Sequence, residues 1–122
     1  MFRRKPRDWK PAELVAAMVG RNAQLWVALT QAGVTEAMEL RLDFFYDSAG
    51  EASDSELAAF LESETDYEVL RTSKQYGVTG STQPTTVTRQ KLDEWVEWMV
   101  LAGYEHGHCK FDGWGAPIPQ AE

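Results

Sequence analysis

Four side chains with metal-ligand chemistry lie close together near the C-terminal end of the sequence. They are His106, His108, Cys109 and Asp112, and imidazole, thiolate and carboxylate groups are the usual ligands of zinc. His106 and His108 would share a face if this piece were extended. No second element with CxxC or HxxxH spacing is found, so zinc would need a distant ligand. We therefore predict no metal and interpret Cys109 as a small buried hydrophobic residue on the last strand.

Residues that could support catalysis do not form a nucleophile and base pair. The chain has many Ser and Thr residues but no G-x-S-x-G motif, and its two His residues flank one turn. Asp43 and Asp47 share one face of a predicted strand, where carboxylates are more often solvated than catalytic. Gly113-Trp114-Gly115 lacks the Lys and the helix that a P-loop requires. The sequence therefore predicts a protein that is not an enzyme and needs no cofactor.

The strand that carries these carboxylates is predicted at Met38–Asp47, MELRLDFFYD. Alternate residues from Met38 to Tyr46 are apolar, which is typical of a strand with one buried side. The opposite side carries Arg41, three carboxylates and Phe45. A shift of one residue would bury these charges, so the register is well specified.

Helices are predicted on both sides of this strand. Pro11 to Gly33 fits either a helical hairpin or one kinked helix, with Gly20 as the break and Asn22 as the cap of the second part. Ser53 and Glu56 have the form of a capping box for a short amphipathic helix that contains Leu57, Phe60 and Leu61 and ends near Thr65. Thr88 is expected to cap the last helix, in which one face is formed by Leu92, Trp95, Val96, Met99 and Gly103.

Two glycines give alternatives for the end of the last helix. Gly103 is either a close-packing position or the stop, with Gly107 the alternative stop. The remaining strands are predicted at Tyr67–Thr72, Gln75–Thr82 and, as an edge strand, His108–Trp114.

This order of elements is that of an α+β ferredoxin-like sandwich, βαββαβ, with one or two N-terminal helices before an antiparallel-rich four-stranded sheet. We expect the first and third strands to be parallel neighbours at the centre of the sheet. Both later helices should cover one face, which leaves the face with Phe45 open.

Composition indicates one globular domain of 122 residues, 43% of them hydrophobic and 25% charged. Residues 1–10 form a basic N-terminal arm that contains Arg3, Arg4, Lys5, Arg7 and Lys10. Residues 11–122 form a single domain with seven basic and eighteen acidic side chains, a formal net charge of −11. Such a surface favours basic partners and repels phosphate backbones. The arm fits a nucleic-acid contact, a membrane contact or a solvated segment against its own acidic domain.

The expected location is cytoplasmic. No apolar run approaches the roughly 20 residues needed to span a bilayer. The single Cys109 allows no internal disulfide, in agreement with a reducing compartment.

The run Cys109-Lys110-Phe111-Asp112-Gly113-Trp114-Gly115 resembles the end of the RraB family, the regulators known as ribonuclease E inhibitor B. The resemblance extends over residues 24–118. It implies a ferredoxin-like fold with a leading helix, no catalytic activity, and inhibition of an RNA-degrading enzyme. Inhibition would occur by binding outside the active site, in a region rich in basic residues, which suits the acidic domain.

The outer side of the last helix is the first candidate for partner binding. At about 100° per residue, Glu94, Glu97, Trp98 and Leu101 turn outward or to the side. An exposed Trp and Leu among carboxylates suits a basic, partly apolar protein segment. The alternative is that the leading helix folds over and buries Trp98.

The open sheet face is the second candidate. Phe45 and Trp114 there would form a stacking platform of the kind that RNA-binding domains use, although Asp43, Asp47 and Asp112 would share the face. Asp112-Gly113-Trp114 has two interpretations, a turn followed by a Trp that closes the core, or a recognition motif.

Overall fold

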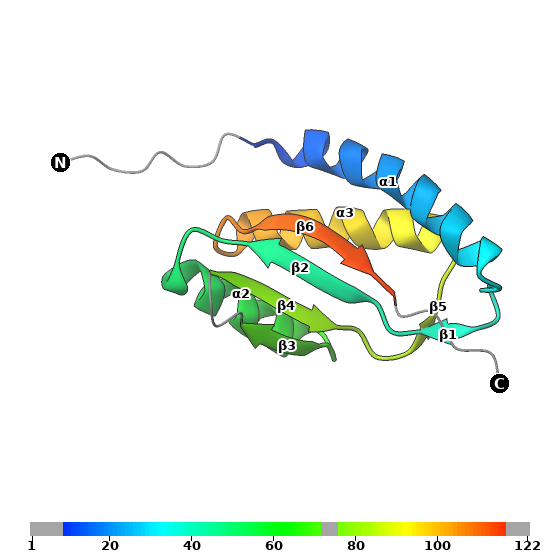
Figure 1. The fold of residues 1–122 in the computed structure, drawn as a ribbon. Coiled ribbons are helices and arrows are strands. Elements are labelled where there is room, and N and C mark those ends of the chain that lie inside the picture. The colour runs from blue at the N-terminus through cyan, green and yellow to red at the C-terminus, as the bar shows by residue number, and fades with distance from the viewer. Residues whose placement is uncertain (1–8, 72–75, 117–122) are drawn as a thin grey trace.

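The computed structural model describes residues 9–71 and 76–116. Within these ranges the chain has an α+β fold with three helices and two antiparallel sheets (Figure 1). No helix in the described ranges combines the length and the apolar character that a membrane crossing needs. The elements are α1 (Pro11–Gln31), β1 (Glu39–Leu40), β2 (Asp43–Asp47), α2 (Glu51–Glu64), β3 (Glu68–Arg71), β4 (Gly77–Ser81), β5 (Thr85–Thr86), α3 (Arg89–Glu105) and β6 (Lys110–Gly115).

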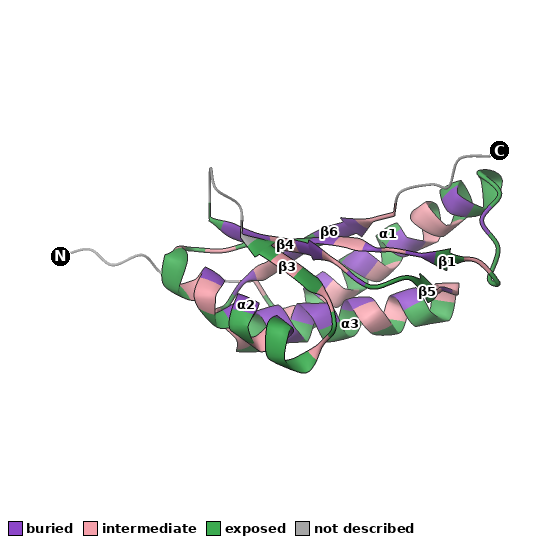
Figure 2. Cartoon of the chain, turned by 90° about the horizontal axis from the view of Figure 1, so that it is seen from below, coloured by how far each residue is buried: buried purple, intermediate pink, exposed green. Residues whose placement is uncertain are grey.

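The larger sheet has the strand order β3-β4-β2-β6, and every neighbouring pair is antiparallel. Helices α2 and α3 lie on one face of it, and none of the described helices covers the other face (Figure 2). The predicted central neighbours, β2 and β4, are adjacent, but the prediction that they are parallel was wrong. Strands β2 and β3, which are joined through α2, run in the same direction. Strand β4 reverses direction after β3 and lies between β2 and β3, so it is antiparallel to both.

The strand predicted at Met38–Asp47 is divided in two. Its first part, β1, pairs with β5 in a separate two-stranded sheet, and β2 belongs to the larger sheet. Thr82 holds the break, because its backbone N–H donates to the Leu42 carbonyl at 2.9 Å and its hydroxyl accepts from the Leu42 N–H at 3.0 Å. The predicted faces are nevertheless confirmed by the alternation of burial. Leu40, Leu42, Phe44 and Tyr46 are buried, while Phe45 is 45% exposed.

Helix α1 is continuous through Gly20, so the helical hairpin did not form. Pro11 occupies its first turn, and Gly33, with a φ of 100°, follows its end. The prediction that Asn22 caps a second helix was wrong, because this residue lies inside α1 and is fully buried. Its burial follows from the packing of α1 along α3 (Figure 1).

The two later helices begin differently. Thr88 caps α3 as predicted, and its hydroxyl accepts from the Lys91 N–H at 3.0 Å. The capping box predicted at Ser53 was wrong, since α2 begins at Glu51 after Gly50 and has no side-chain cap. The hydroxyl of Ser48 instead hydrogen-bonds the carboxylate of Asp54 in the first turn. The predicted end of α2 near Thr65 and the predicted strands β3, β4 and β6 are confirmed where the structure describes them.

The core lies between the sheet and the helix layer. Phe44 on β2 and Phe111 on β6 are fully buried, and the pairing of β2 with β6 confirms that these strands are neighbours. Gly103 is a close-packing position in α3, because a Cβ there would overlap the Cys109 carbonyl oxygen and the Tyr46 ring. The helix ends two residues later, and Gly107 follows with a φ of 97°.

Two Gly→Ala substitutions test this packing. Gly103→Ala should destabilise the fold by about 1–3 kcal/mol, because backbone atoms cannot move aside for the new methyl group. Gly20→Ala is the matched control, since nothing lies within 4 Å of its added Cβ, and it should stabilise the exposed helix by about 1 kcal/mol. Urea unfolding of both variants measures the difference. Equal effects of the two changes would contradict the close approach of α3 to β2 and β6.

Candidate functional site

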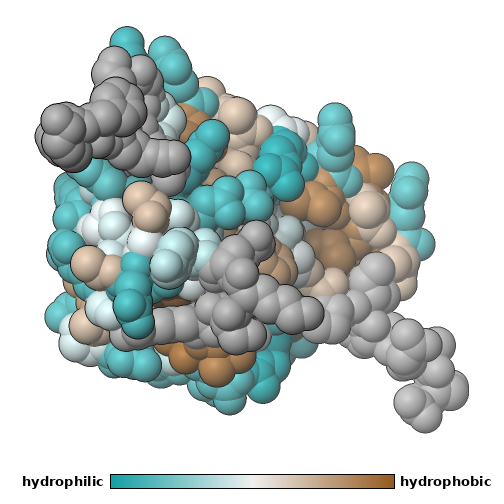
Figure 3. Space-filling model, turned by 60° about the vertical axis from the view of Figure 1, so that its left-hand side comes forward, coloured by the Kyte–Doolittle hydropathy of each residue, from teal (hydrophilic) through white to brown (hydrophobic). Residues whose placement is uncertain are grey.

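An aromatic and aliphatic patch lies on the helix side of the molecule. Trp98 and Leu101 are each 39% exposed, and the Trp98 ring stacks on Phe60 of α2 with centroids 6.0 Å apart. His106 stacks on the same Phe60 ring at 3.7 Å. Trp98 is therefore supported by α2 and not covered by α1. On the face of the molecule seen in Figure 3, apolar side chains gather in patches bordered by hydrophilic ones.

Carboxylates surround these side chains on α3. At about 100° per residue, Glu94, Leu101 and Glu105 fall within about 60° of Trp98 around the helix, and Glu97 lies slightly further round. All three Glu residues are exposed. The ion pairs within the described ranges are Arg41–Glu68 and Arg89–Asp93, so none of the three is neutralised by a cation there. We call Phe60, Trp98, Leu101, Glu94, Glu97 and Glu105 the α3 patch.

Neighbouring helices set the borders of the α3 patch. On one side, α2 presents Phe60 against Trp98. On the other side, α1 contacts α3 through Asn22, whose amide nitrogen donates to the Asp93 carboxylate at 2.9 Å. Trp9, just before α1, packs edge-on against Tyr104 at 5.1 Å. The sequence pattern predicted Glu94, Glu97, Trp98 and Leu101 as members of this patch, but not Glu105. It did not predict that Phe60, expected on the buried side of α2, would join it.

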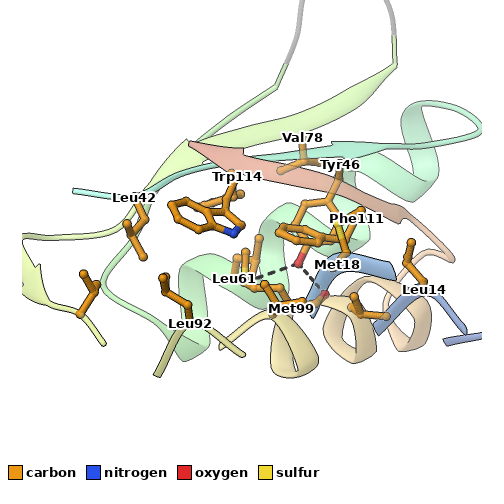
Figure 4. Packing of buried hydrophobic residues seen from close by; sticks show 14 of the residues in the cluster. Leu14, Met18, Leu42, Tyr46, Leu61, Val78, Leu92, Met99, Phe111 and Trp114 are labelled. Atoms are coloured by element: carbon orange, nitrogen blue, oxygen red, sulfur yellow. Dashed lines mark hydrogen bonds between the residues drawn. The ribbon is translucent and has the colours of Figure 1, made fainter. Parts of the chain in front are cut away.

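Among the site residues predicted from the sequence, Trp114 differs most from its predicted position. It is only 7% exposed and points from β6 toward the helix layer (Figure 4). Its indole N–H donates to the side-chain oxygen of Asn22 at 2.7 Å, which satisfies the polar atom of a buried ring. The prediction that Trp114 and Phe45 form one exposed platform was therefore wrong. A Trp in this position closes the end of the core.

Phe45, Asp112 and Gly113 are the other residues predicted to bind a partner on the sheet side. Phe45 and Asp112 are exposed, whereas Gly113 is buried beside Phe45 with a φ of 122°. Leu70 on β3 is 64% exposed in the same row, since it pairs with Thr79, which pairs with Phe45. The face is thus apolar along one row and acidic at Asp43, Asp47 and Asp112.

The His, Cys and Asp residues near the C-terminal end do not converge. Cys109 is fully buried with its Sγ 3.6 Å from the Ser53 carbonyl oxygen, and His108 packs edge-on against Tyr104 at 4.8 Å. Asp112 is exposed on β6, and the ring of His106 stacks on Phe60 of α2. In the part of the chain that the structure describes, no three His, Cys, Asp or Glu residues are placed to hold a metal ion.

A hollow of about 320 Å³ opens between β5, the start of α3 and the start of β3, a feature that the sequence did not predict. The Tyr67 hydroxyl there accepts from the Trp95 indole N–H at 2.9 Å. The pKa of Tyr67 is raised above its ordinary value, chiefly by burial and also by Asp66, while the Trp95 hydrogen bond opposes this shift. The hollow is lined by apolar side chains together with hydroxyl groups and Lys91, among them Leu42, Tyr67, Thr86, Val87, Leu92 and Trp95.

Comparison of the sequence with models of known protein families gives no match, and comparison with curated proteins gives none either.

Removal of the Asn22 amide should weaken the joint between α1, α3 and β6. Asn22→Ala leaves the Trp114 N–H without its acceptor and takes a donor from Asp93, so a loss of about 2–3 kcal/mol in unfolding free energy is expected. Gln24→Ala, at an exposed position of the same helix, should change stability by less than about 0.5 kcal/mol. Denaturant unfolding compares them. Similar stabilities of the two variants would show that the hydrogen bonds do not hold α1 in place.

The hydroxyl of Tyr46 donates to the Met99 carbonyl oxygen at 2.7 Å (Figure 4). Burial raises the pKa of Tyr46 well above its ordinary value of 10.0, and Cys109 and Tyr67 add to the effect. Because the folded-state pKa is above the unfolded one, the stabilisation is fully present below about pH 10 and is lost as the pH rises toward the folded-state value. As the pH rises above about 10, Tyr46→Phe should therefore lose less stability than the unchanged protein. The exposed Tyr76→Phe serves as control, and equal slopes for both variants would contradict the assignment.

Proposed function

We propose that this chain is a non-catalytic regulatory domain that binds a basic, partly apolar segment of a protein partner through the α3 patch. The observation that carries the proposal is the exposed Trp98 and Leu101 pair, which is stacked on Phe60 and bordered by Glu94, Glu97 and Glu105. Aromatic side chains at the centre of an interface commonly dominate binding free energy, while charged groups at the rim steer association. The net charge of −11 over residues 11–122 favours the same kind of partner.

We further propose that the partner is an RNA-degrading enzyme of the ribonuclease E type, bound in its basic region, and that the chain is RraB-like. The Asp112-Gly113-Trp114 motif supports this proposal, because it follows the order of elements that the resemblance implies. The strand order β3-β4-β2-β6, with α2 and α3 on one face, supports a ferredoxin-like sandwich preceded by one helix. A chain that binds its target in this way requires no catalytic group.

RNA binding by the open sheet face is the alternative proposal. Exposed Phe45 favours it, since bases stack on aromatic rings, and exposed Leu70 extends the apolar row beside Phe45. Burial of Trp114 removes one of the two aromatic rings of the expected platform, and Asp43, Asp47 and Asp112 repel phosphates. The two functions use opposite faces of the molecule, which makes them separable by substitution.

A pair of double variants separates these functions. Trp98→Ser with Leu101→Ser should weaken binding to the purified basic region of a ribonuclease E-type enzyme by at least about tenfold, because both anchors leave the interface. Phe45→Ser with Leu70→Ser, at comparably exposed positions on the opposite face, should leave that binding unchanged. Fluorescence anisotropy measures affinity, and thermal unfolding confirms that each variant is folded.

The outcomes are distinct. Loss of binding in the sheet-face variant alone would move the interface to the sheet. A gel shift with single-stranded RNA at low salt, abolished only by the sheet-face pair, would favour the RNA alternative.

A further inference from the structure

The segment that precedes Trp9 enters the fold beside the α3 patch. The Trp9 ring lies edge-on to Tyr104, with centroids 5.1 Å apart and an interplanar angle of 82°. Tyr104 is three residues from Leu101 and next to Glu105, so it belongs to the same end of α3 as the patch. Residues 1–8 are therefore tethered at one border of an acidic, partly apolar surface.

The tether is long enough to span that surface. Six residues of helix separate Tyr104 from Trp98, a rise of about 9 Å. Eight residues of chain extend over as much as about 26–29 Å. Every member of the α3 patch is thus within reach of the segment that begins at Trp9.

The charges of segment and surface are opposite. Residues 1–8, MFRRKPRD, contain four basic residues and one acid, with Phe2 as an apolar side chain. The α3 patch has three carboxylates that no cation neutralises within the described ranges. The last turn of α3 contains no basic residue, so the partial negative charge of the helix C-terminus is also uncompensated there.

We propose that the basic segment at residues 1–8 binds the α3 patch of its own chain and competes with the partner for it. The competition rests on the proposed function, whereas the contact itself does not. Arg3, Arg4, Lys5 and Arg7 would meet the carboxylates, and Phe2 would meet Trp98 or Leu101. A tethered ligand acts at an effective concentration in the millimolar range, so even weak contacts suffice to occupy the surface. A partner would then need to displace the segment before it binds.

The test compares the full chain with a full-chain variant in which Arg3, Arg4, Lys5 and Arg7 are replaced by Ser. Amide chemical shifts of residues 94–105 should differ between the two proteins at low salt. At about 0.5 M NaCl, where charges are screened within a few ångströms, the unchanged chain should approach the variant. Identical shifts for residues 94–105 in both proteins at low salt would overturn the proposal.

Substitutions on the acidic side provide a matched pair. Glu97→Gln with Glu105→Gln should abolish the difference in shifts that the basic residues cause. Glu36→Gln with Glu39→Gln removes the same number of exposed carboxylates away from α3 and should preserve it. A difference that disappears on dilution of the protein would assign the contact to a second copy and overturn the own-chain proposal.

Binding to the purified basic region of a ribonuclease E-type enzyme tests the competition separately. Neutralisation of the four basic residues should strengthen that binding by about three- to tenfold. The α3 patch would then be free in a larger fraction of the molecules, and apparent affinity rises with that fraction. Unchanged affinity would overturn the competition. Shift differences in the absence of any binding by either protein would support the intramolecular contact while refuting the proposed function, so the two failures are distinguishable.

Discussion

The side-chain amide of Asn22 joins three elements that are far apart in the sequence. Its oxygen accepts from Trp114 on β6 and its nitrogen donates to Asp93 on α3, whose carboxylate also accepts from Arg89 at 3.3 Å. A fully buried amide requires partners on both ends, because an unpaired polar group in the core costs free energy. This requirement determines where α1 crosses α3. It also determines the rotation of α1 about its own axis, since only one face of the helix carries Asn22.

The position of α1 determines which part of α3 remains accessible. Helix α1 and the preceding Trp9 cover the side of α3 that contains Asp93 and Tyr104, and α2 supports another side through Phe60 and Trp98. The strip between them contains Glu94, Glu97, Leu101 and Glu105. The strip is acidic because it contains three Glu residues, and it is accessible because the neighbours of α3 cover other sides of this helix. The candidate binding surface and the core joint are consequences of the same packing.

The two faces of the larger sheet have different characters for a similar reason. One face is sealed by α2 and α3, so Phe44, Tyr46, Phe111 and Trp114 are buried between layers. The other is covered by none of the helices that the structure describes, and a row from Leu70 through Thr79 to Phe45 remains in contact with solvent. Carboxylates lie beside this row and also in the α3 patch. Both surfaces therefore repel phosphates, which favours a protein partner over a nucleic acid. The regulatory proposal and its RNA-binding alternative therefore differ in the face that they use.

Local patterns in the sequence determined much of this protein. Period-two alternation predicted which residues of Met38–Asp47 are buried, the Thr88 cap predicted the start of α3, and helical periodicity predicted the outward position of Trp98 and Leu101. These features depend on neighbours in the chain and on steric rules that act over a few residues. The tertiary structure decided the break at Leu42, which Thr82 holds from 40 residues away, and the burial of Trp114 against Asn22, 92 residues away. It also brought Phe60 of α2 beneath Trp98. Such contacts form only when distant segments pack together. A side chain such as that of Trp114 suits either the core or the surface, and the residues that pack against it decide which of the two it occupies.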